Sequence, residues 1–267
     1  MVLFAENGGT LAQIAGGSWD FKHGHVIRRH SHREDQLLFA SSGVMTADTE
    51  EGVWVVPPLR AVWIPAGTKH SILMSGRVSM RTLYFLPRLC ATLPRKAVVI
   101  NVSSLLRELI LHACTFLRLR KQFKPERHVI DLILDQLRTA ESIPVQLPRP
   151  SDPRAKKLVE MLFADPADSR ALEELASACG SSKRTMQRLF ANETGMSFGR
   201  WRQRLRFITA MQHLAAGGSV TEAALEAGYS TPSAFISMFR KQVGTSPTRY
   251  LSRAAEEVTT AFKIPAR

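Results

Sequence analysis

The spacing of apolar and polar residues divides the chain into two parts. Before about residue 100, short apolar runs alternate with turn residues such as Gly43, Gly52 and Pro57, and they predict strands at 36–40, 44–49, 52–56 and 60–64. Short strands at this spacing are typical of a small antiparallel barrel or sandwich. From Ser103 onward, apolar residues recur every three or four positions, which predicts helices at 105–117 and 130–137.

Caps and chain breakers refine these boundaries. Ser103 or Ser104 is expected to cap the first helix, and Pro125 interrupts the chain before the second. Four prolines between 142 and 153 predict a semi-rigid linker without structured elements. We therefore expect an α+β protein with a β domain and flanking helices at 1–142, a linker at 143–153, a helical domain at 154–253 and a loosely held tail at 254–267.

The helical domain contains an internal repeat. The segment 172–180 aligns with 220–228, and the segment 190–195 aligns with 239–244 after a one-residue insertion. In each copy an alanine is followed four residues later by a glycine, and a phenylalanine is followed five residues later by another glycine. A small residue below a crossing helix and a glycine in the turn are the pattern of a helix-turn-helix. The matching residues are Ala176, Gly180, Phe190 and Gly195 in the first copy and Ala224, Gly228, Phe239 and Gly244 in the second.

Over roughly 154–251 these motifs resemble the AraC/XylS family of bacterial transcription regulators, and the ending Phe239-Arg-Lys-Gln-Val-Gly-Thr-Ser-Pro247-x2-Tyr250 is among the most specific features. The repeat predicts two recognition helices that bind double-stranded DNA, joined by an amphipathic helix at 197–216. A helix of about 17 residues spans about 25 Å. Together with the width of the flanking units, this length suits a separation between the two recognition helices near one DNA turn, about 34 Å. One chain would then read two adjacent major-groove segments.

The first recognition helix carries long polar side chains on its outward face. Met186, Leu189 and Phe190 are expected to pack inward. Arginine matches the edge of guanine, and glutamine matches that of adenine. The base-reading candidates are Lys183, Arg184, Gln187 and Arg188 in the first copy, and Thr231, Ser233 and Ser237 in the second. Because the second set is short, we expect the first copy to supply most of the sequence discrimination.

Basic residues dominate between Lys183 and Arg206, where only Glu193 is acidic. A solvated helix face is the plain interpretation, and contact with DNA phosphates is the functional one. The candidates for phosphate contact are Arg200, Arg202, Arg204, Arg206, Arg240 and Lys241.

Composition supports an acidic polymer as partner. Lys and Arg number 36 against 23 Asp and Glu, giving a formal charge of +13. A hydrophobic content of 45% excludes a wholly disordered chain. Three widely spaced cysteines argue against a disulfide framework and a C-x-x-C metal knuckle. Because neither a signal peptide nor an apolar run of membrane-spanning length is apparent, we expect a cytoplasmic protein with no membrane partner.

The β domain contains a second resemblance, to the cupin barrel. Its motifs are Gly24-x5-His30-x-His32-x3-Gln36-x6-Gly43 and Pro65-x-Gly67-x2-His70. The resemblance implies that His30, His32 and His70, with Gln36 as a fourth ligand, hold a divalent transition metal. Gln36 replaces the usual glutamate and Met74 the usual asparagine, which weakens metal binding. A polar pocket for an organic effector without metal, and solvent-facing histidines, remain open alternatives.

His30 and His32 are expected to point to one face of a single strand, with His70 on a neighbouring strand. Trp54 and Trp63 either line a pocket for an aromatic compound or belong to the core.

Cupin-like barrels also include oxygenases and isomerases, so an enzyme carrying a DNA-binding unit is the lesser alternative. The departures from the cupin motif argue against it, and no nucleophile elbow, phosphate-binding glycine loop or acid pair occurs at recognisable spacing. The favoured hypothesis is a non-enzymatic regulator that senses a small-molecule or metal effector and acts on RNA polymerase at a promoter.

The predicted helices at 103–142 have broad apolar faces. They either pack on their own barrel or leave Leu106, Ile110 and Leu117 for a second copy, and we expect a homodimer through this region.

Overall fold

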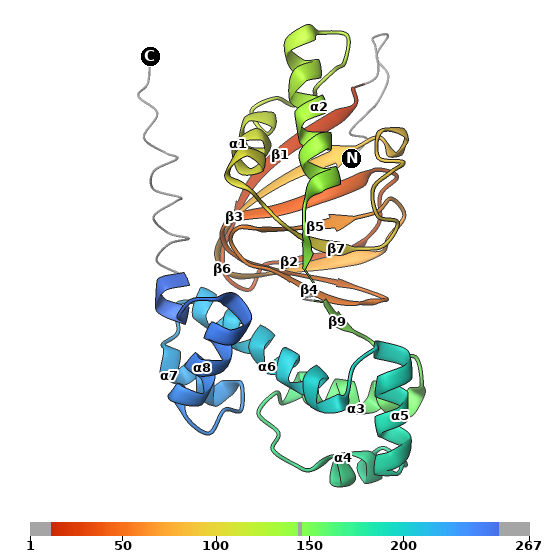
Figure 1. Ribbon diagram of the computed structural model, residues 1–267, viewed down its shortest axis with the longest axis vertical. Coiled ribbons are helices and arrows are strands. Elements are labelled where there is room, and N and C mark those ends of the chain that lie inside the picture. Colours follow the sequence, from red (N-terminus) through yellow and green to blue (C-terminus); the bar gives the residue numbers. More distant parts are fainter. Residues whose placement is uncertain (1–11, 144–145, 251–267) are drawn as a thin grey trace. The chain divides into compact units, whose positions relative to one another are not determined.

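The computed structural model describes residues 12–143 and 146–250 of the chain (Figure 1). They form two compact units, 12–49 with 54–143, and 50–53 with 146–250. The first unit is built mainly from strands and the second mainly from helices, which confirms the α+β class. The expected tail at 254–267 lies outside the described residues.

The first unit is an antiparallel sheet. Its strands follow the order β1-β6-β3-β5-β7-β8, with β2 paired to β6 and β4 paired to β3. The strands of this sheet are β1 (Ile14–Phe21), β2 (Val26–His30), β3 (Asp35–Thr49), β4 (Gly52–Val56, of which Gly52 and Val53 belong to the second unit), β5 (Arg60–Ile64), β6 (His70–Phe85), β7 (Val98–Asn101) and β8 (Ser142–Ile143). A short 3-10 helix, η1 (Pro87–Leu89), precedes β7.

Sequence patterning located β4 and β5 correctly but divided β3 in two. The predicted strands at 36–40 and 44–49 are one strand because Gly43, at φ +72°, continues the chain through a bulge. A side chain at Gly43 would lie 2.5 Å from the carbonyl oxygen of Arg77, so the close approach to β6 also requires glycine.

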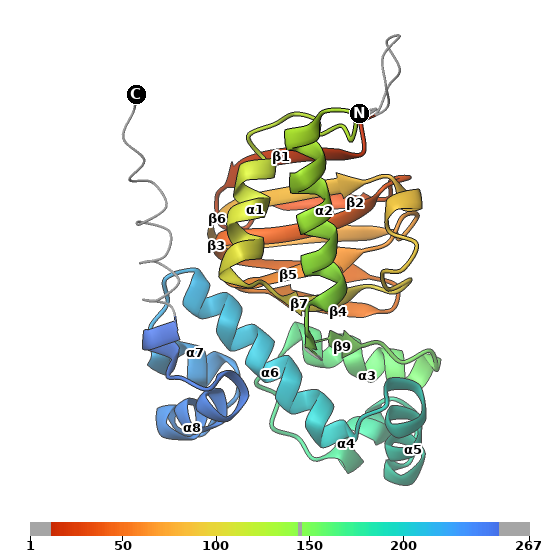
Figure 2. The same cartoon turned by 45° about the horizontal axis from the view of Figure 1, so that its top comes forward.

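The strands bury both faces. Leu37 and Phe39 belong to a core that includes the helices, whereas Leu38 and Ala40 belong to a second core on the opposite face. Helices α1 (Ser104–Ala113) and α2 (Lys124–Thr139) lie side by side over the sheet (Figure 2). Burial on both faces produces continuous apolar runs in place of strict alternation.

Helix α1 differs from the prediction in the residues that it leaves available to a second copy of the chain. Leu106 and Ile110 are fully buried in the core of their own unit, so the prediction that they are available to a second chain is wrong. The first helix ends at Ala113, and Leu117 lies beyond it with 87% of its surface exposed. Ser103 caps this helix by accepting a hydrogen bond from the Leu106 N–H.

The second unit contains six helices within the described ranges. They are α3 (Pro153–Ala164), α4 (Leu172–Ala178), α5 (Lys183–Thr194), α6 (Phe198–Ala215), α7 (Val220–Glu226) and α8 (Pro232–Val243). Helix α6 is the predicted connecting helix. Its buried stripe is as expected, with Trp201, Leu205, Ile208, Met211 and Leu214 all buried. None of the helices in the described ranges combines the length and apolar character that a membrane crossing requires.

The predicted linker contains a structured element. Residues Gln146–Pro148 form strand β9, which pairs with β4, and the Arg149 N–H donates to the Glu51 carbonyl oxygen at 3.2 Å. The prediction of a linker without structured elements at 143–153 is wrong here. Hydrogen bonds from main-chain and side-chain partners order this segment although its sequence has only a weak apolar pattern. Proline is tolerated at Pro148 because it ends the strand.

Candidate DNA-binding surface and histidine cluster

The two helix-turn-helix copies have the same turn. Gly180 and Gly228 adopt left-handed conformations with φ of +68° and +75°. In the first copy the Ser181 N–H donates to the Ala176 carbonyl oxygen at 2.9 Å, and in the second Tyr229 donates to Ala224 at the same distance. Both alanines are fully buried. The structure thus confirms the predicted left-handed glycine in each turn and shows that each alanine is buried.

The recognition helices α5 and α8 are bounded in the same way. The Ser182 hydroxyl accepts from the Thr185 N–H, and the Thr231 hydroxyl accepts from the Ala234 N–H. Each helix ends at a left-handed glycine, Gly195 or Gly244. This C-terminal cap explains the glycine of the repeated Phe-x4-Gly ending.

Helix α5 has a buried and an exposed face. Met186 and Phe190 are fully buried, and Leu189 is half-buried. The four base-reading candidates are all exposed: Lys183, Arg184, Gln187 and Arg188. Lys183 also forms an ion pair with Glu173 of α4, a partner that its position in the sequence did not indicate.

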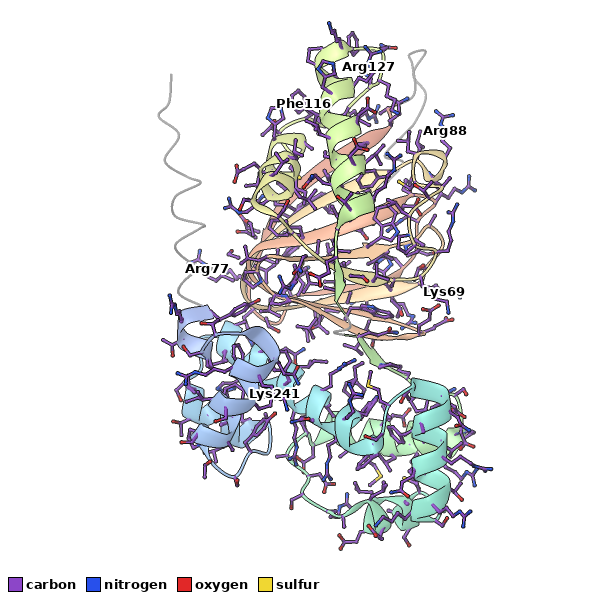
Figure 3. The ribbon with its side chains drawn as sticks, in the orientation of Figure 1. Lys69, Arg77, Arg88, Phe116, Arg127 and Lys241 are labelled. Carbon is purple, nitrogen blue, oxygen red and sulfur yellow. The ribbon has the colours of Figure 1, made fainter. Side chains whose placement is uncertain are left out.

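Helix α8 exposes shorter side chains. Ser233 and Ser237 are exposed one helical turn apart. Thr231 is exposed as well, but its oxygen already accepts the capping hydrogen bond. Arg240 and Lys241 are exposed on the last turn, where Figure 3 labels Lys241.

The arginines of α6 fall into two groups. Arg200 is exposed, whereas Arg202, Arg204 and Arg206 are half-buried. The three half-buried guanidinium groups donate to main-chain carbonyl oxygens of the second unit: Arg202 to Arg170 at 2.8 Å, Arg204 to Gln146 at 2.7 Å, and Arg206 to Pro166 at 3.3 Å and Asp168 at 3.2 Å. These contacts hold the segments before α3 and α4, a packing role that the charge count did not anticipate.

The three histidines of the first unit lie together. The ring centroids of His30 and His70 are 4.4 Å apart, and those of His32 and His70 are 5.2 Å apart. One nitrogen from each of the three rings lies within 4.8 Å of the other two. Antiparallel pairing of β2 with β6 places His30 opposite His70. The Gly67 N–H donates to the His32 carbonyl oxygen at 2.8 Å, which joins the two predicted motifs.

The element that carries His32 differs from the one predicted. Strand β2 ends at His30, so His32 does not share a strand with it, and the prediction of one common strand is wrong. His70 on a neighbouring strand is as predicted. The buried Gln36 amide lies next to the cluster, with its Oε1 3.1 Å from His32 Nε2.

Two polar residues that hold Gln36 were missed by the sequence analysis. Its amide nitrogen donates to the Thr82 hydroxyl at 3.0 Å and to the Tyr84 hydroxyl at 3.2 Å. Thr82 and Tyr84 are two residues apart on β6, so they share one face, and this spacing was the available signal. Burial is the main cause that raises the pKa of Tyr84 and lowers the pKa of His70 to about 4.

A separate cavity lies beside α2 and β7. Its volume is about 520 Å³, within the range of small-molecule sites. The walls are mostly apolar, and Arg138 supplies a cation that also pairs with Asp135 at 2.9 Å. The lining residues are Trp63, Thr92, Leu93, Pro94, Val98, Ile100, Leu137, Arg138, Ala140 and Ser142. Trp63 thus belongs both to the core and to a pocket wall, whereas Trp54 is fully buried in the core.

A strand-built domain with a ligand-sized cavity, joined to two helix-turn-helix motifs, defines the class of effector-responsive transcription regulators. Residues 12–139 match the family model of the AraC-like ligand-binding domain, and residues 175–253 match that of a helix-turn-helix domain. The chain is 36% identical over 224 residues to the HTH-type transcriptional regulator NimR of Escherichia coli, covering 84% of this chain and 82% of that protein. This chain belongs to the AraC family of transcription regulators.

Other relatives match different lengths of the chain. The HTH-type transcriptional regulator RipA of Corynebacterium glutamicum is 35% identical over 103 residues, which cover 39% of this chain and 31% of RipA. The HTH-type transcriptional activator RhaR of Mannheimia succiniciproducens is 24% identical over 243 residues, which cover 85% of this chain and 87% of RhaR.

Proposed function

We propose that this regulator reads promoter DNA mainly with helix α5 and anchors to the duplex with helix α8. The observation that carries this proposal is the exposed set Lys183, Arg184, Gln187 and Arg188 on α5, next to a core-facing stripe that fixes the helix. In the major groove arginine presents two donors to guanine, and glutamine presents one donor and one acceptor to adenine. Helix α8 offers only hydroxyl groups at Thr231, Ser233 and Ser237, which discriminate bases weakly.

Phosphate contacts come chiefly from the exposed basic residues Arg200, Arg240 and Lys241. Phosphate contacts set the position and salt dependence of binding, and base contacts set its sequence preference. Arg202, Arg204 and Arg206 already donate to carbonyl oxygens, so in this proposal they support the DNA-binding unit and add electrostatic attraction.

The test is a comparison of variants on a panel of operator sequences. Arg184→Ala or Gln187→Ala is expected to relax base preference at one or two positions, at a cost of about 1–3 kcal/mol per lost base contact. Ser233→Ala on α8 is the matched control and is expected to leave the preference almost unchanged. If Ser233→Ala relaxes the preference more than Arg184→Ala does, the assignment of base reading to α5 is wrong.

The cavity beside α2 accepts the organic effector in this proposal. Its apolar walls and the Arg138 guanidinium favour a molecule with an apolar body and one acidic group. Such a ligand controls promoter binding if it has different affinity for two arrangements of the protein. In this proposal the protein acts by binding and not by catalysis. It is a homodimer in the cytoplasm, and it contacts RNA polymerase.

Anilinonaphthalene sulfonate, an aromatic anion, is a suitable probe of the cavity. We expect its fluorescence to report one site per chain and Arg138→Ala to weaken binding about tenfold, a loss of about 1.4 kcal/mol. Arg127→Ala, an exposed position on the same helix, is the control. Equal affinity of the two variants would exclude Arg138 as the acidic-group partner.

A further inference from the structure

Glu193 is the only acidic residue between Lys183 and Arg206, and it lies in the last turn of helix α5. The dipole of a helix is negative at its C-terminus, so a carboxylate in the last turn destabilises the helix. Among basic side chains that attract DNA phosphates, the same carboxylate also weakens the attraction. Two unfavourable electrostatic effects at one position call for a contact that offsets them.

The offsetting contacts lie in the segment where the chain enters the second unit, residues 146–152, which we call the entry segment. Glu193 Oε2 accepts hydrogen bonds from the Ser151 N–H at 2.6 Å and from the Asp152 N–H at 3.0 Å. Burial acts to raise the pKa of Glu193, but these hydrogen bonds outweigh it and hold the pKa below its ordinary value. Asp152 is the N-cap of helix α3, where a negative charge is favourable. The ionised carboxylate therefore joins the end of α5 to the start of α3.

The entry segment is itself held firmly by helix α6. Arg204 donates to the Gln146 carbonyl oxygen at 2.7 Å, and the Trp201 indole donates to that of Pro148 at 2.8 Å. Leu147 between them is fully buried. A carboxylate bonded to a segment held in this way restrains the end of the helix that carries it.

This restraint bears on the base-reading side chains because small tilts of α5 move them appreciably. Without the bonds at Glu193, the helix is held by its buried face, where Phe190 contacts the rings of Phe198 and Trp201. Arg184 lies about 9 Å from Phe190 along the helix axis, so a tilt of about 6° displaces it by about 1 Å. Hydrogen bonds of this kind span only about 2.7–3.2 Å, and a displacement of that size weakens or breaks them.

We propose that Glu193 is a positioning residue for base reading, whose two hydrogen bonds to the entry segment set the tilt of α5 in the major groove. The inference rests on the proposed reading of bases by α5 and extends it. Glu193 has the wrong charge to bind phosphates and acts through the base-reading side chains. Loss of its hydrogen bonds is therefore expected to weaken discrimination between sequences even though a repulsive charge is removed.

The test uses the full-length protein and a duplex selected with it from a random-sequence library, together with single-base variants of that duplex. Glu193→Gln and Glu193→Ala remove the same charge, but only glutamine keeps a side-chain oxygen that accepts hydrogen bonds. We expect Glu193→Ala to reduce the affinity ratio between the selected duplex and its variants on the order of tenfold, the scale of one base contact. Glu193→Gln is expected to keep most of the ratio.

Glu160→Ala, which removes an exposed carboxylate from α3, is the matched control and keeps the full ratio. Each variant is measured below its own thermal transition. A role in stability alone would lower that transition and leave the affinity ratio unchanged. The proposal is overturned if Glu193→Ala keeps the ratio of Glu160→Ala, and also if Glu193→Gln loses as much as Glu193→Ala does.

Arg184→Ala and Gln187→Ala are measured on the same duplexes so that the two proposals can fail separately. If both keep the full ratio, base reading by α5 is wrong and the role of Glu193 falls with it. If they lose the ratio while Glu193→Ala keeps it, base reading by α5 stands and only the positioning role is wrong.

Discussion

The indole nitrogen of Trp201 donates to the carbonyl oxygen of Pro148 at 2.8 Å. This bond ties the connecting helix α6 to a segment that precedes the helical domain. Trp201→Phe removes the donor and leaves the carbonyl without it, which we expect to destabilise the second unit by about 1–2 kcal/mol. Calorimetry of the full chain measures the change, with the exposed Trp19→Phe in the first unit as control. An unchanged transition for Trp201→Phe would show that this bond contributes nothing.

The two turn glycines are expected to respond differently to alanine. At Gly180 an added Cβ would meet nothing within 4 Å, so Gly180→Ala costs only the left-handed conformation, about 1–2 kcal/mol. At Gly228 the Cβ would lie 2.8 Å from the Ala167 Cα and 2.9 Å from Arg206 Nη2. We therefore expect Gly228→Ala to lower the free energy of unfolding clearly more than Gly180→Ala does in urea titrations. Equal losses would contradict this difference between the copies.

The helix caps of the two copies are also unequal. In the second copy the Ser219 hydroxyl accepts from the Glu222 N–H, and the Glu222 carboxylate accepts from the Ser219 N–H. In the first copy Glu174 makes the equivalent bond to the Ala171 N–H, but Ala171 has no hydroxyl to return it.

Ala171→Ser is expected to complete the capping box and to stabilise the second unit by about 0.5–1 kcal/mol, whereas Ser219→Ala destabilises it by about 1 kcal/mol. The two variants are compared by their denaturation midpoints. Shifts in the same direction would refute the account.

The salt dependence of DNA binding separates the two groups of arginines on α6. Arg200→Ala is expected to reduce the slope of log affinity against log salt by about 0.9, the value for one phosphate contact, without changing stability. Arg206→Ala is expected to lower stability instead, because it releases the carbonyl oxygens of Pro166 and Asp168. Operator titrations at several salt concentrations, with a thermal melt of each variant, check both outcomes. A full slope change for Arg206→Ala at unchanged stability would place its guanidinium on the DNA.

Thiol chemistry provides a pH test of the first unit. Burial, with a smaller contribution from Asp35, raises the pKa of Cys90 to about 12 from an ordinary value near 9. The folded state therefore holds the proton longer than the unfolded state, and the stability from this group is complete below pH 9 and is lost as the pH rises toward 12. We expect Cys90 to resist a disulfide reagent at pH 8 until denaturant is added. Fast labelling of Cys90 in the native protein would show that the site opens.

The sequence predicted the second unit better than the first because its signals are local. Ala176, Gly180 and Ser182 lie close together in the sequence, so their spacing alone specifies the turn and the start of the next helix. In the first unit β6 pairs with three other strands, and the alternation of buried and less buried positions along β6 does not identify these partners. The position of His32 depends on a hydrogen bond between its main chain and that of Gly67 in the other motif. A contact between residues so far apart in the sequence produces no periodic pattern from which it can be predicted.

The same limit applies to charge. Arg200 and Arg204 look alike in the sequence, yet one is exposed and the other donates to Gln146. Only the fold decides which arginine is left for a partner, because guanidinium groups serve carbonyl oxygens and phosphates with the same donors.

The exposed face of α5 has a consequence for the history of such proteins. Arg184, Gln187 and Arg188 take no part in the buried packing of their unit. Substitutions at these positions therefore meet little selection for folding, and under the proposed base reading by α5 successive changes retarget the protein to other promoters while its architecture persists. Descendants of one gene could thus come to govern unrelated operons with no loss of thermal robustness.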